Sequence, residues 1–353
     1  MSSTEIIKVD PFYPKEEDIN KAAQILNRGG LVIIPTETVY GIAADMSNKI
    51  ALDRLYEIKK RPKDKPFSLH IADKEKIEEF AKDIPISAYK LIDRFWPGAL
   101  TLILKAKEGT TIGMRMPDNE IALKVISRVE TPIVCPSANL SGKAAPINFE
   151  EAITDLKGLV DFAIDAGKTR IGLESTIVDM TVEPARILRE GAIKKEEIEA
   201  VIKQKVVLVV CTGNSCRSVM VKALLDKKLE EKKREDVQVL SAGTMMMGGA
   251  SATEATQEIL SREGIDVSGH RSQGVTREMI KKADIILVME KLHEERILEL
   301  VPQAKNRLFL LKEFVKISNN NLNIADPIGK PIDFYEVTFN VIKEAVERLI
   351  DLI

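Results

Sequence analysis

VVLVVCTGNSCRS (206–218) joins a run of apolar residues to a short loop that contains two cysteines and an arginine. The apolar residues are mostly β-branched, which is typical of a strand covered on both faces. Gly213 and Asn214 allow the tight, partly left-handed backbone of an anion-binding loop. The residues after Ser218 have helical spacing, so backbone amides and a helix dipole should converge on Cys211.

This environment favours the thiolate of Cys211, which is the nucleophilic form of cysteine. Arg217 follows six residues later, and its planar guanidinium can bind a tetrahedral oxyanion through paired hydrogen bonds. The plainer alternative is a structural cysteine before a glycine turn. We interpret the segment as a phosphate-binding loop in which Cys211 is the nucleophile.

Most of residues 205–353 resembles the low-molecular-weight protein tyrosine phosphatase family. Beyond the cysteine loop, the similar segments are SAG (241–243), GIDVSGHRS (264–272), ADIILVME (283–290) and an Asp-Pro pair at 326–327. The resemblance implies a Rossmann-like parallel α/β fold and a phosphocysteine intermediate. It implies neither a cofactor nor a metal for this reaction.

By the same resemblance, Cys211 is the nucleophile, Arg217 binds phosphate and Ser218 steadies the thiolate. Asp326 is then the general acid, which protonates the leaving group and afterwards activates water. The phosphate loop also includes Thr212, Gly213, Asn214, Ser215 and Cys216.

Two features indicate the substrate of this phosphatase-like segment. Ser215 carries a hydroxyl where tyrosine-specific members usually have an apolar residue, and Ile328 and Gly329 replace the aromatic pair that holds a phosphotyrosine ring. Both features resemble the arginine-phosphatase branch, although that branch usually has threonine at the Ser215 position and an aromatic residue after the proline. Phosphoarginine in a phosphoprotein is therefore favoured over phosphotyrosine.

Two alternatives remain for this segment. CTGNSCRS also occurs in arsenate reductases of the same fold, but these need further cysteines, and none follows Cys216. A domain that binds phosphoprotein without turnover is the other alternative, although Cys211, Arg217 and Asp326 are all retained.

The composition is that of an ordinary globular protein, with 353 residues, 44% hydrophobic and 30% charged residues, and a net charge of −2. This length predicts two domains, 1–202 and 203–353, with no flexible linker between them.

Three cysteines indicate a reducing compartment without disulfides. MSSTEIIKVD (1–10) has neither the basic start nor the apolar core of a signal peptide, and no apolar run is long enough to span a membrane. We expect a cytoplasmic protein.

The first two hundred residues alternate between helical and strand patterns. Helices are expected at 18–30, 51–61 and 194–204, and a buried strand at 31–35. Further strands are expected at 67–72, 99–106, 112–117, 132–136, 160–166, 175–180 and 185–190. Arg115 falls within one of these strands, where an unpaired charge is costly, so an anionic partner is expected.

Four motifs in this half together resemble the threonylcarbamoyl-adenylate synthase (YrdC-like) family over roughly residues 10–195. They are PTETVYG (35–41), Lys59-x-Arg61-Pro, Ser137-x-Asn139 and ESTI (174–177). The resemblance implies a twisted open α/β sheet with a positively charged cleft. It implies that ATP is bound by Lys59, Arg61, Lys65, Thr111, Asn139 and Arg189. It implies that L-threonine is bound by Thr38, His70, Arg115, Ser137 and Ser175.

The implied reaction joins L-threonine, bicarbonate and ATP into threonylcarbamoyl-AMP and releases pyrophosphate, with Mg²⁺ accompanying ATP. The product then serves tRNA modification through a separate transferase complex, and tRNA is a candidate partner. The chain would be a multifunctional enzyme that fuses a nucleotidyltransferase to a protein phosphatase. The alternative for this half is a module whose basic concave face binds double-stranded RNA.

Overall fold

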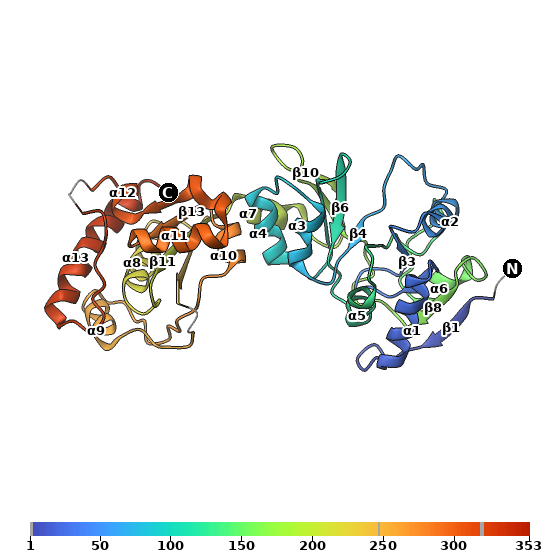
Figure 1. Cartoon of the computed structure of the whole chain (residues 1–353), viewed down its shortest axis with the longest axis horizontal. Helices are drawn as coiled ribbons and strands as arrows, with labels where there is room; N and C mark the ends of the chain where they lie inside the picture. Colours follow the sequence, from blue (N-terminus) through green and yellow to red (C-terminus); the bar gives the residue numbers. More distant parts are fainter. Residues whose placement is uncertain (1–2, 246–247, 318–320) are drawn as a thin grey trace. The chain divides into compact units, whose positions relative to one another are not determined.

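The computed structural model describes residues 3–245, 248–317 and 321–353, and these divide into two compact units, Met1–Val201 and Ile202–Ile353. Figure 1 shows both units, coloured along the sequence. Each has its own sheet and its own hydrophobic core. Among the described residues, no helix combines the length and apolar character that a membrane crossing requires.

The first unit is built on one mixed sheet, for which the described residues give ten strands in the order β1-β8-β2-β3-β7-β4-β6-β5-β9-β10. The strands are β1 (Glu5–Lys8), β2 (Val32–Ile34), β3 (Gly41–Asp45), β4 (Leu69–His70), β5 (Leu100–Lys105), β6 (Thr111–Arg115), β7 (Ile133–Val134), β8 (Phe162–Asp165), β9 (Thr176–Asp179) and β10 (Arg186–Arg189). The sheet contains both parallel and antiparallel pairs, and β4 lies between antiparallel β7 and parallel β6.

Helices pack against this sheet through their apolar faces. They are α1 (Glu16–Asn27), α2 (Lys49–Lys59), the short 3₁₀ helix η1 (Lys74–Lys76), α3 (Ile77–Phe80), α4 (Ile86–Phe95), α5 (Glu120–Arg128), α6 (Phe149–Thr154) and α7 (Lys195–Lys203). Asn48 caps α2, and its side chain accepts a hydrogen bond from the Ala51 amide. At the other end Lys60 adopts left-handed geometry, with φ 44°, which stops the helix directly after Lys59.

The second unit contains a four-stranded sheet in the order β12-β11-β13-β14 within the described residues, and every pairing is parallel. The strands are β11 (Lys205–Cys211), β12 (Val237–Gly243), β13 (Ile285–Val288) and β14 (Leu308–Leu310). The helices are α8 (Arg217–Glu231), α9 (Glu254–Arg262), α10 (Arg277–Lys282), α11 (Lys291–Leu300), the 3₁₀ helix η2 (Pro302–Arg307), α12 (Leu311–Phe314) and α13 (Ile332–Leu349).

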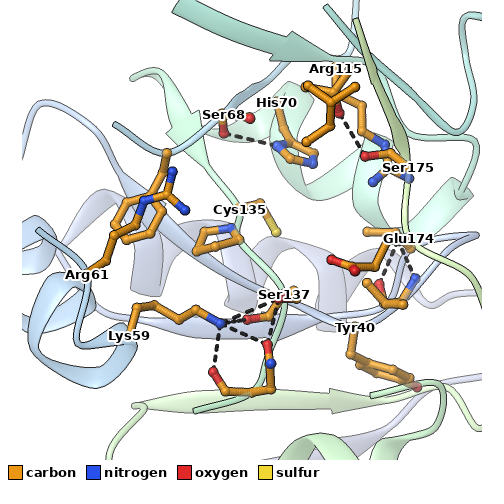
Figure 2. A pocket seen from close by; sticks show the side chains of 18 of the residues that line it. Tyr40, Lys59, Arg61, Ser68, His70, Arg115, Cys135, Ser137, Glu174 and Ser175 are labelled. Carbon is orange, nitrogen blue, oxygen red and sulfur yellow. Dashed lines mark hydrogen bonds between the residues drawn. The ribbon is translucent and has the colours of Figure 1, made fainter. Parts of the chain in front are cut away.

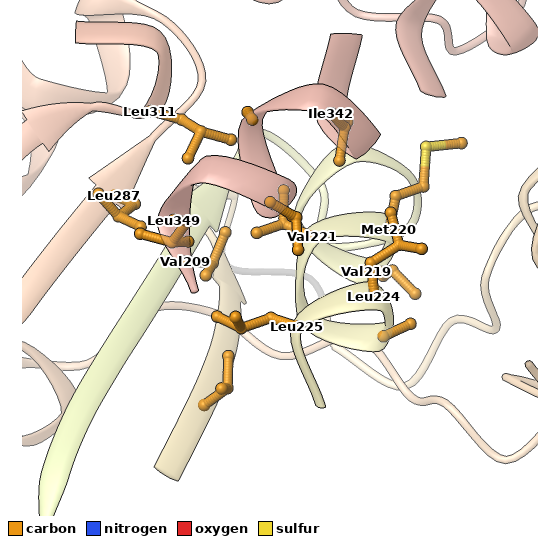
Figure 3. Packing of buried hydrophobic residues seen from close by; sticks show 14 of the residues in the cluster. Val209, Val219, Met220, Val221, Leu224, Leu225, Leu287, Leu311, Ile342 and Leu349 are labelled. Carbon is orange, nitrogen blue, oxygen red and sulfur yellow. The ribbon is translucent and has the colours of Figure 1, made fainter. Parts of the chain in front are cut away.

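The core beside the cysteine loop is formed where α8 and α13 pack together on one face of this sheet (Figure 3). Val209 of β11, Leu225 of α8 and Leu349 of α13 are all fully buried there. Burying a side chain of this size contributes about 1.5–3 kcal/mol. This packing fixes the end of β11 and the start of α8, and the cysteine loop connects these two points.

The expected fold class is confirmed for both halves. The apolar run at 206–210 is the central strand β11, as its β-branched composition predicts. The expected strands of the first half are all present, although some are shorter, such as β4 within 67–72. The antiparallel strand β3 is not among the expected strands, and it begins at Gly41, the last residue of the motif PTETVYG.

Gly243, at the end of β12, lets this strand approach the cysteine loop. A Cβ atom at this position would lie 2.8 Å from the Thr212 carbonyl oxygen, 2.9 Å from the Gly213 carbonyl carbon and 3.0 Å from the Asn214 amide nitrogen. All three are backbone atoms, so no side chain can rotate away. The loop would have to move instead.

We therefore predict that Gly243→Ala destabilises the second unit by about 1–3 kcal/mol through overpacking, and that it weakens phosphate binding. Thermal unfolding of the full chain and calorimetric titration with inorganic phosphate would measure the two effects. Gly269→Ala is a matched control, because a Cβ there meets nothing within 4 Å. Equal melting temperatures for the two variants would contradict this prediction.

Candidate active sites

The first unit contains a cavity of about 400 Å³ between the segment after β2 and the ends of β4, β6 and β10. Figure 2 shows side chains that line it. Those that the sequence predicted are Lys59, Arg61, His70, Arg115, Ser137, Asn139, Ser175 and Arg189. Residues separated by more than a hundred positions thus converge on one polar cavity.

Lys59 ties the end of α2 to the Ser137–Asn139 loop. Its Nζ atom donates to the backbone oxygens of Ser137 and Asn139, both at 2.7 Å, and to Asn139 Oδ1 at 2.8 Å. Burial, together with the charge of nearby Arg61, lowers the pKa of Lys59 to about 8. The ammonium group therefore holds the loop while carrying a charge that burial disfavours.

Arg61 forms one wall of the same cavity. Its Nε atom donates to the Lys65 backbone oxygen at 2.7 Å, and its guanidinium lies over the Phe67 ring at 5.1 Å from the centroid. Lys65 contributes this carbonyl oxygen, but its own side chain is exposed and does not line the cavity. The loop 61–66 thus fixes the direction of the arginine.

Arg115 is only 6% exposed and has the anionic partner that its position in a strand predicts. That partner is Glu37, whose Oε1 accepts from Nη2 at 2.7 Å, while Thr38 Oγ1 accepts from the same nitrogen at 2.8 Å. Within the described residues Nη1 carries no hydrogen bond, and Arg115 lines the cavity. One face of the guanidinium is therefore fixed and another remains able to bind an anion.

His70 lies beside Arg115 and is buried, with 5% of its surface exposed. Burial lowers its pKa to about 3, and the charge of Arg115 acts in the same direction. Its Nδ1 is 3.3 Å from the Ser68 backbone oxygen, and because a carbonyl only accepts, Nδ1 carries the ring proton. His70 is therefore neutral, with Nε2 as an acceptor.

Arg189 is oriented by the ESTI segment. It donates to Glu174 Oε1 at 2.6 Å and through Nη2 to the Ser175 backbone oxygen at 2.9 Å. Glu174 also lines the cavity and is the one acidic residue among the described lining residues. Cys135 lines it as well, but burial raises the pKa of this thiol to about 12, so the thiol stays protonated.

Not every predicted residue reaches the cavity. Thr38 is fully buried one layer behind it and acts on it through Arg115. Thr111 is exposed at the opposite end of β6 from Arg115, which places it about 13 Å away along the strand. The sequence analysis also missed Glu37 and Glu174, although both acids stand inside the motifs PTETVYG and ESTI.

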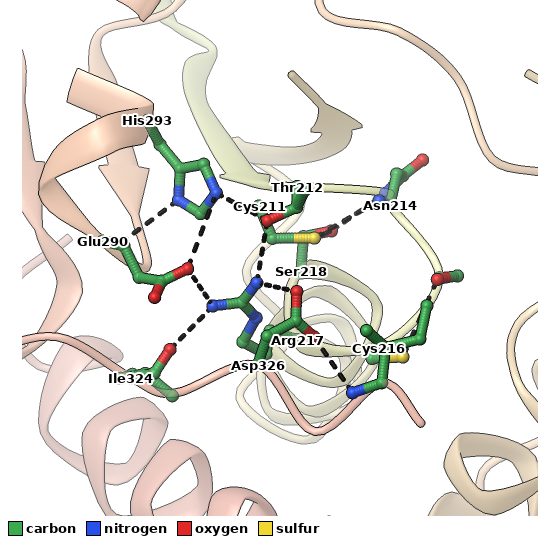
Figure 4. Close-up of polar contacts among 12 residues, drawn as sticks. Cys211, Thr212, Asn214, Cys216, Arg217, Ser218, Glu290, His293, Ile324 and Asp326 are labelled. Carbon is green, nitrogen blue, oxygen red and sulfur yellow. Dashed lines mark hydrogen bonds and ion pairs between the residues drawn. The ribbon is translucent and has the colours of Figure 1, made fainter. Parts of the chain in front are cut away.

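In the second unit, the loop between β11 and α8 surrounds Cys211, which is 2% exposed (Figure 4). Its Sγ lies 3.0 Å from Ser218 Oγ and accepts a hydrogen bond from the Asn214 amide at 3.3 Å. Asn214 has φ 53°, the left-handed conformation expected for the loop. Its side chain donates to Ser218 Oγ and to Ser241 Oγ, at 3.0 and 3.1 Å. The sulfur is thus held in place by contacts within the loop.

Arg217 is 1% exposed, and its guanidinium is bonded on several sides. Nη1 donates to Glu290 Oε2 at 2.6 Å and to the Ile324 backbone oxygen at 2.7 Å. Nη2 donates to Thr212 Oγ1 at 3.0 Å and also pairs with the Asp326 carboxylate. Asp326, predicted as the general acid, therefore lies beside the predicted phosphate ligand.

Ser215 and Cys216, later in the same loop, contact residues outside it. Cys216 is 3% exposed, and its Sγ lies 3.5 Å from Thr253 Oγ1 and 3.7 Å from the Tyr335 hydroxyl. The Ser215 backbone oxygen accepts from the Thr253 amide at 3.1 Å. Sequence analysis did not identify Thr253 or Tyr335, and no motif around either residue marks it.

Glu290 and His293 were also missed as site residues. Glu290 precedes α11 and pairs with Arg217, while the His293 ring is buried and contacts Thr212. The signal was present in the segment ADIILVME, which ends at Glu290 directly after a buried strand. Side chains at the carboxyl ends of parallel strands gather at one edge of the sheet.

Comparisons with known proteins assign a class to each unit. Residues 24–191 match the family model Sua5_yciO_yrdC, described as telomere recombination, and residues 206–353 match the model for low molecular weight phosphotyrosine protein phosphatase. The chain thus combines a Sua5-type α/β unit with a phosphatase-type α/β unit.

A putative threonylcarbamoyl-AMP synthase from Methanocaldococcus jannaschii is 36% identical over 204 residues, which are 55% of this chain and 96% of that protein. The chain therefore belongs to the Sua5/YciO/YrdC family. Threonylcarbamoyl-AMP synthase from Pyrococcus abyssi is 45% identical over 197 residues, but the match spans 53% of this chain and only 58% of that relative. The crystal structure of P. abyssi Sua5 complexed with L-threonine is 31% identical with a TM-score of 0.55, over 87% of this chain and 99% of that one.

We predict that polyphosphate binding to the first unit weakens as the pH rises through about 8. Burial has lowered the pKa of Lys59 to about 8, and a bound polyanion would favour the charged form and raise this pKa again. Above pH 8 binding therefore requires uptake of a proton, so the affinity should fall by up to about tenfold per pH unit. Below that pH the Lys59 contribution should be constant.

Titration with tripolyphosphate between pH 7.5 and 9.5 would measure this dependence. Lys63→Met is the matched control, because Lys63 is exposed and its pKa is raised by Asp53, so it stays charged throughout this range. An affinity independent of pH in the unmodified chain would contradict the role given to Lys59.

Proposed function

We propose that the first unit synthesises threonylcarbamoyl-AMP from L-threonine, bicarbonate and ATP, and that the second unit dephosphorylates proteins through Cys211. The convergence of Lys59, Arg61, Arg115 and Arg189 on one cavity carries the first proposal. The contacts of Cys211, Arg217 and Asp326 carry the second. The chain would then be a bifunctional enzyme whose first product serves tRNA modification.

Binding in the first unit follows from its charges. Arg61 and Arg189, with Lys59, would hold the triphosphate of ATP, and Asn139 and Ser137 would contact it or the amino acid. Arg115 would bind the carboxylate of L-threonine through Nη1, while Glu37 keeps its guanidinium in place. The L-threonine complex of P. abyssi Sua5 supports threonine as the substrate.

The synthase reaction requires no enzyme nucleophile. The neutral amine of threonine would attack CO₂ derived from bicarbonate, giving a carbamate. A carbamate oxygen would then attack the α-phosphorus of ATP, and the bond to pyrophosphate would break. Holding two anionic reactants together in a basic cavity is the main catalytic contribution. Mg²⁺ would accompany ATP as part of the substrate, and Glu174 is the lining carboxylate able to contact it.

In the second unit, the Cys211 thiolate would attack phosphorus while Asp326 protonates the departing group. Arg217 would bind two phosphoryl oxygens once the substrate displaces the Asp326 carboxylate from Nη2. That displacement would also free Asp326 to act as the acid. Water, deprotonated by Asp326, would then hydrolyse the phosphocysteine and release inorganic phosphate.

We propose phosphoarginine as the preferred substrate over phosphotyrosine. The support comes from Ser215, whose hydroxyl belongs to the phosphate loop, and from the Asp-Pro loop. There Ile328 and Gly329 carry no aromatic ring, so neither residue can stack on a phenol ring. Tyr335 is buried against Cys216 and cannot serve this purpose either.

A substitution in one unit should impair the activity of that unit alone. We predict that Arg61→Ala lowers threonine-dependent pyrophosphate release by tenfold or more, through loss of a charged contact to the triphosphate. It should leave hydrolysis of an aryl phosphate by the second unit unchanged.

Cys211→Ser should abolish hydrolysis of the aryl phosphate and leave pyrophosphate release intact. If Arg61→Ala released pyrophosphate at the full rate, the synthase assignment of the cavity would be wrong.

Substrate preference should depend on Ser215. We predict that Ser215→Ile shifts the ratio of kcat/KM values from phosphoarginine towards phosphotyrosine by about 10–100-fold, because it removes a polar contact and adds apolar surface. Ser215→Thr retains the hydroxyl and should keep the preference of the unmodified chain. A preference for phosphotyrosine that neither substitution alters would contradict this account.

A further inference from the structure

The hydrogen bonds around Thr212 determine where its hydroxyl proton points (Figure 4). The first of them starts at His293, which is fully buried at the first turn of α11. The backbone N–H of Glu290 donates to His293 Nδ1 at 3.2 Å. An imidazole nitrogen that accepts a hydrogen bond carries no proton, so the proton of the neutral ring is on Nε2.

His293 Nε2 lies 3.0 Å from Thr212 Oγ1. Because Nε2 carries the proton, the imidazole donates and the threonine oxygen accepts. Burial, reinforced by the charge of Arg217, lowers the pKa of His293 to about 4, so the ring keeps this arrangement at neutral pH.

Arg217 supplies the second hydrogen bond to the same oxygen. Its Nη2 lies 3.0 Å from Thr212 Oγ1, and a guanidinium can only donate. A hydroxyl oxygen has two lone pairs, and both are now occupied. The proton of the Thr212 hydroxyl must therefore point away from His293 and from Arg217.

The remaining direction is that of the phosphate site. Arg217 Nη2 is shared between Thr212 Oγ1 and the Asp326 carboxylate. A phosphoryl oxygen that replaces Asp326 on this nitrogen would lie next to the Thr212 hydroxyl. The described residues show no other hydrogen-bond partner of that hydroxyl, so its proton is available.

We propose that the Thr212 hydroxyl donates a hydrogen bond to the transferred phosphoryl group, and that His293 is the positioning residue that fixes its direction. This inference rests on the proposed phosphatase function of the second unit. The hydroxyl adds a side-chain donor to the backbone amides and the arginine, and it acts where negative charge is spread over the phosphoryl oxygens. Glu290 completes the arrangement, because its backbone sets the His293 tautomer and its carboxylate holds Arg217.

The alternative is that Thr212 and His293 only brace Arg217. A double-mutant cycle separates the two cases. If His293 acts only by directing the Thr212 proton, its removal has no further effect once that hydroxyl is absent. If His293 instead supports the fold around Arg217, the two losses add.

The experiment measures kcat/KM for p-nitrophenyl phosphate with the full chain and four variants. We expect Thr212→Val to lower kcat/KM by about tenfold or more, and Thr212→Ser to stay within about threefold of the unmodified chain. His293→Phe should lower it by a similar factor to Thr212→Val, and the double variant Thr212→Val/His293→Phe should equal Thr212→Val. Thermal unfolding would confirm that each variant is folded.

Calorimetric binding of inorganic phosphate to the same proteins gives a second readout that does not depend on turnover. The affinity should fall in Thr212→Val and be restored in Thr212→Ser. If the unmodified chain hydrolyses no substrate, the proposed function fails, while this titration still tests the hydrogen bond. Unmodified kcat/KM and phosphate affinity in Thr212→Val, or additive losses in the double variant, would overturn the proposal.

Discussion

A buried guanidinium must be surrounded by hydrogen-bond acceptors, and each unit of this chain is organised around one. Arg115 and Arg217 are 6% and 1% exposed. Removing such a charge from water costs several kcal/mol unless acceptors replace the water. Glu37 meets this need for Arg115, and Glu290 with a backbone carbonyl meets it for Arg217. The acceptors also fix the direction of each guanidinium, so that the remaining N–H groups are available to an anionic ligand.

The surroundings of the two fixed arginines are suited to different chemistry. In the first unit the cavity has cationic side chains and hydroxyls, and its one thiol, Cys135, is kept protonated by burial. Such a cavity can gather anions but cannot form a covalent intermediate through that thiol. In the second unit the arginine belongs to the same loop as Cys211, whose sulfur accepts a hydrogen bond from the Asn214 backbone amide. The proposed phosphoryl transfer through cysteine requires both an oxyanion-binding group and a nucleophile, and the second unit has an arginine and a cysteine suited to these roles.

The strands and the loops after them could be predicted from the sequence, because local patterns determine them. The apolar run before Cys211 and the glycine and asparagine after it specify a strand and a tight turn through their own backbone preferences. The partners of the site residues could not be predicted in this way. Glu37 and Arg115 are 78 residues apart, and Arg217 and Glu290 are 73 apart. The sequence showed that Arg115 needs an anion, but only the three-dimensional arrangement shows that the chain supplies one itself. Thr111 shows a second limit, since a strand pattern does not show which of its residues line the cavity, and Thr111 lies at the other end of β6 from Arg115.

Each site also places a buried histidine beside its arginine, and the arginine helps to keep it neutral. The pKa of His70 is lowered to about 3 and that of His293 to about 4, in both cases first by burial and then by the adjacent guanidinium. A neutral imidazole has one donor and one acceptor, so the bond made by Nδ1 decides what Nε2 can do. In His70, Nδ1 donates to the Ser68 carbonyl, and Nε2 is left as an acceptor; in His293, Nδ1 accepts from the Glu290 amide, and Nε2 becomes a donor. The same side chain, with a similarly lowered pKa, therefore presents opposite hydrogen-bonding groups to the two sites. The backbone group facing Nδ1, and not the titration of the ring, makes the difference.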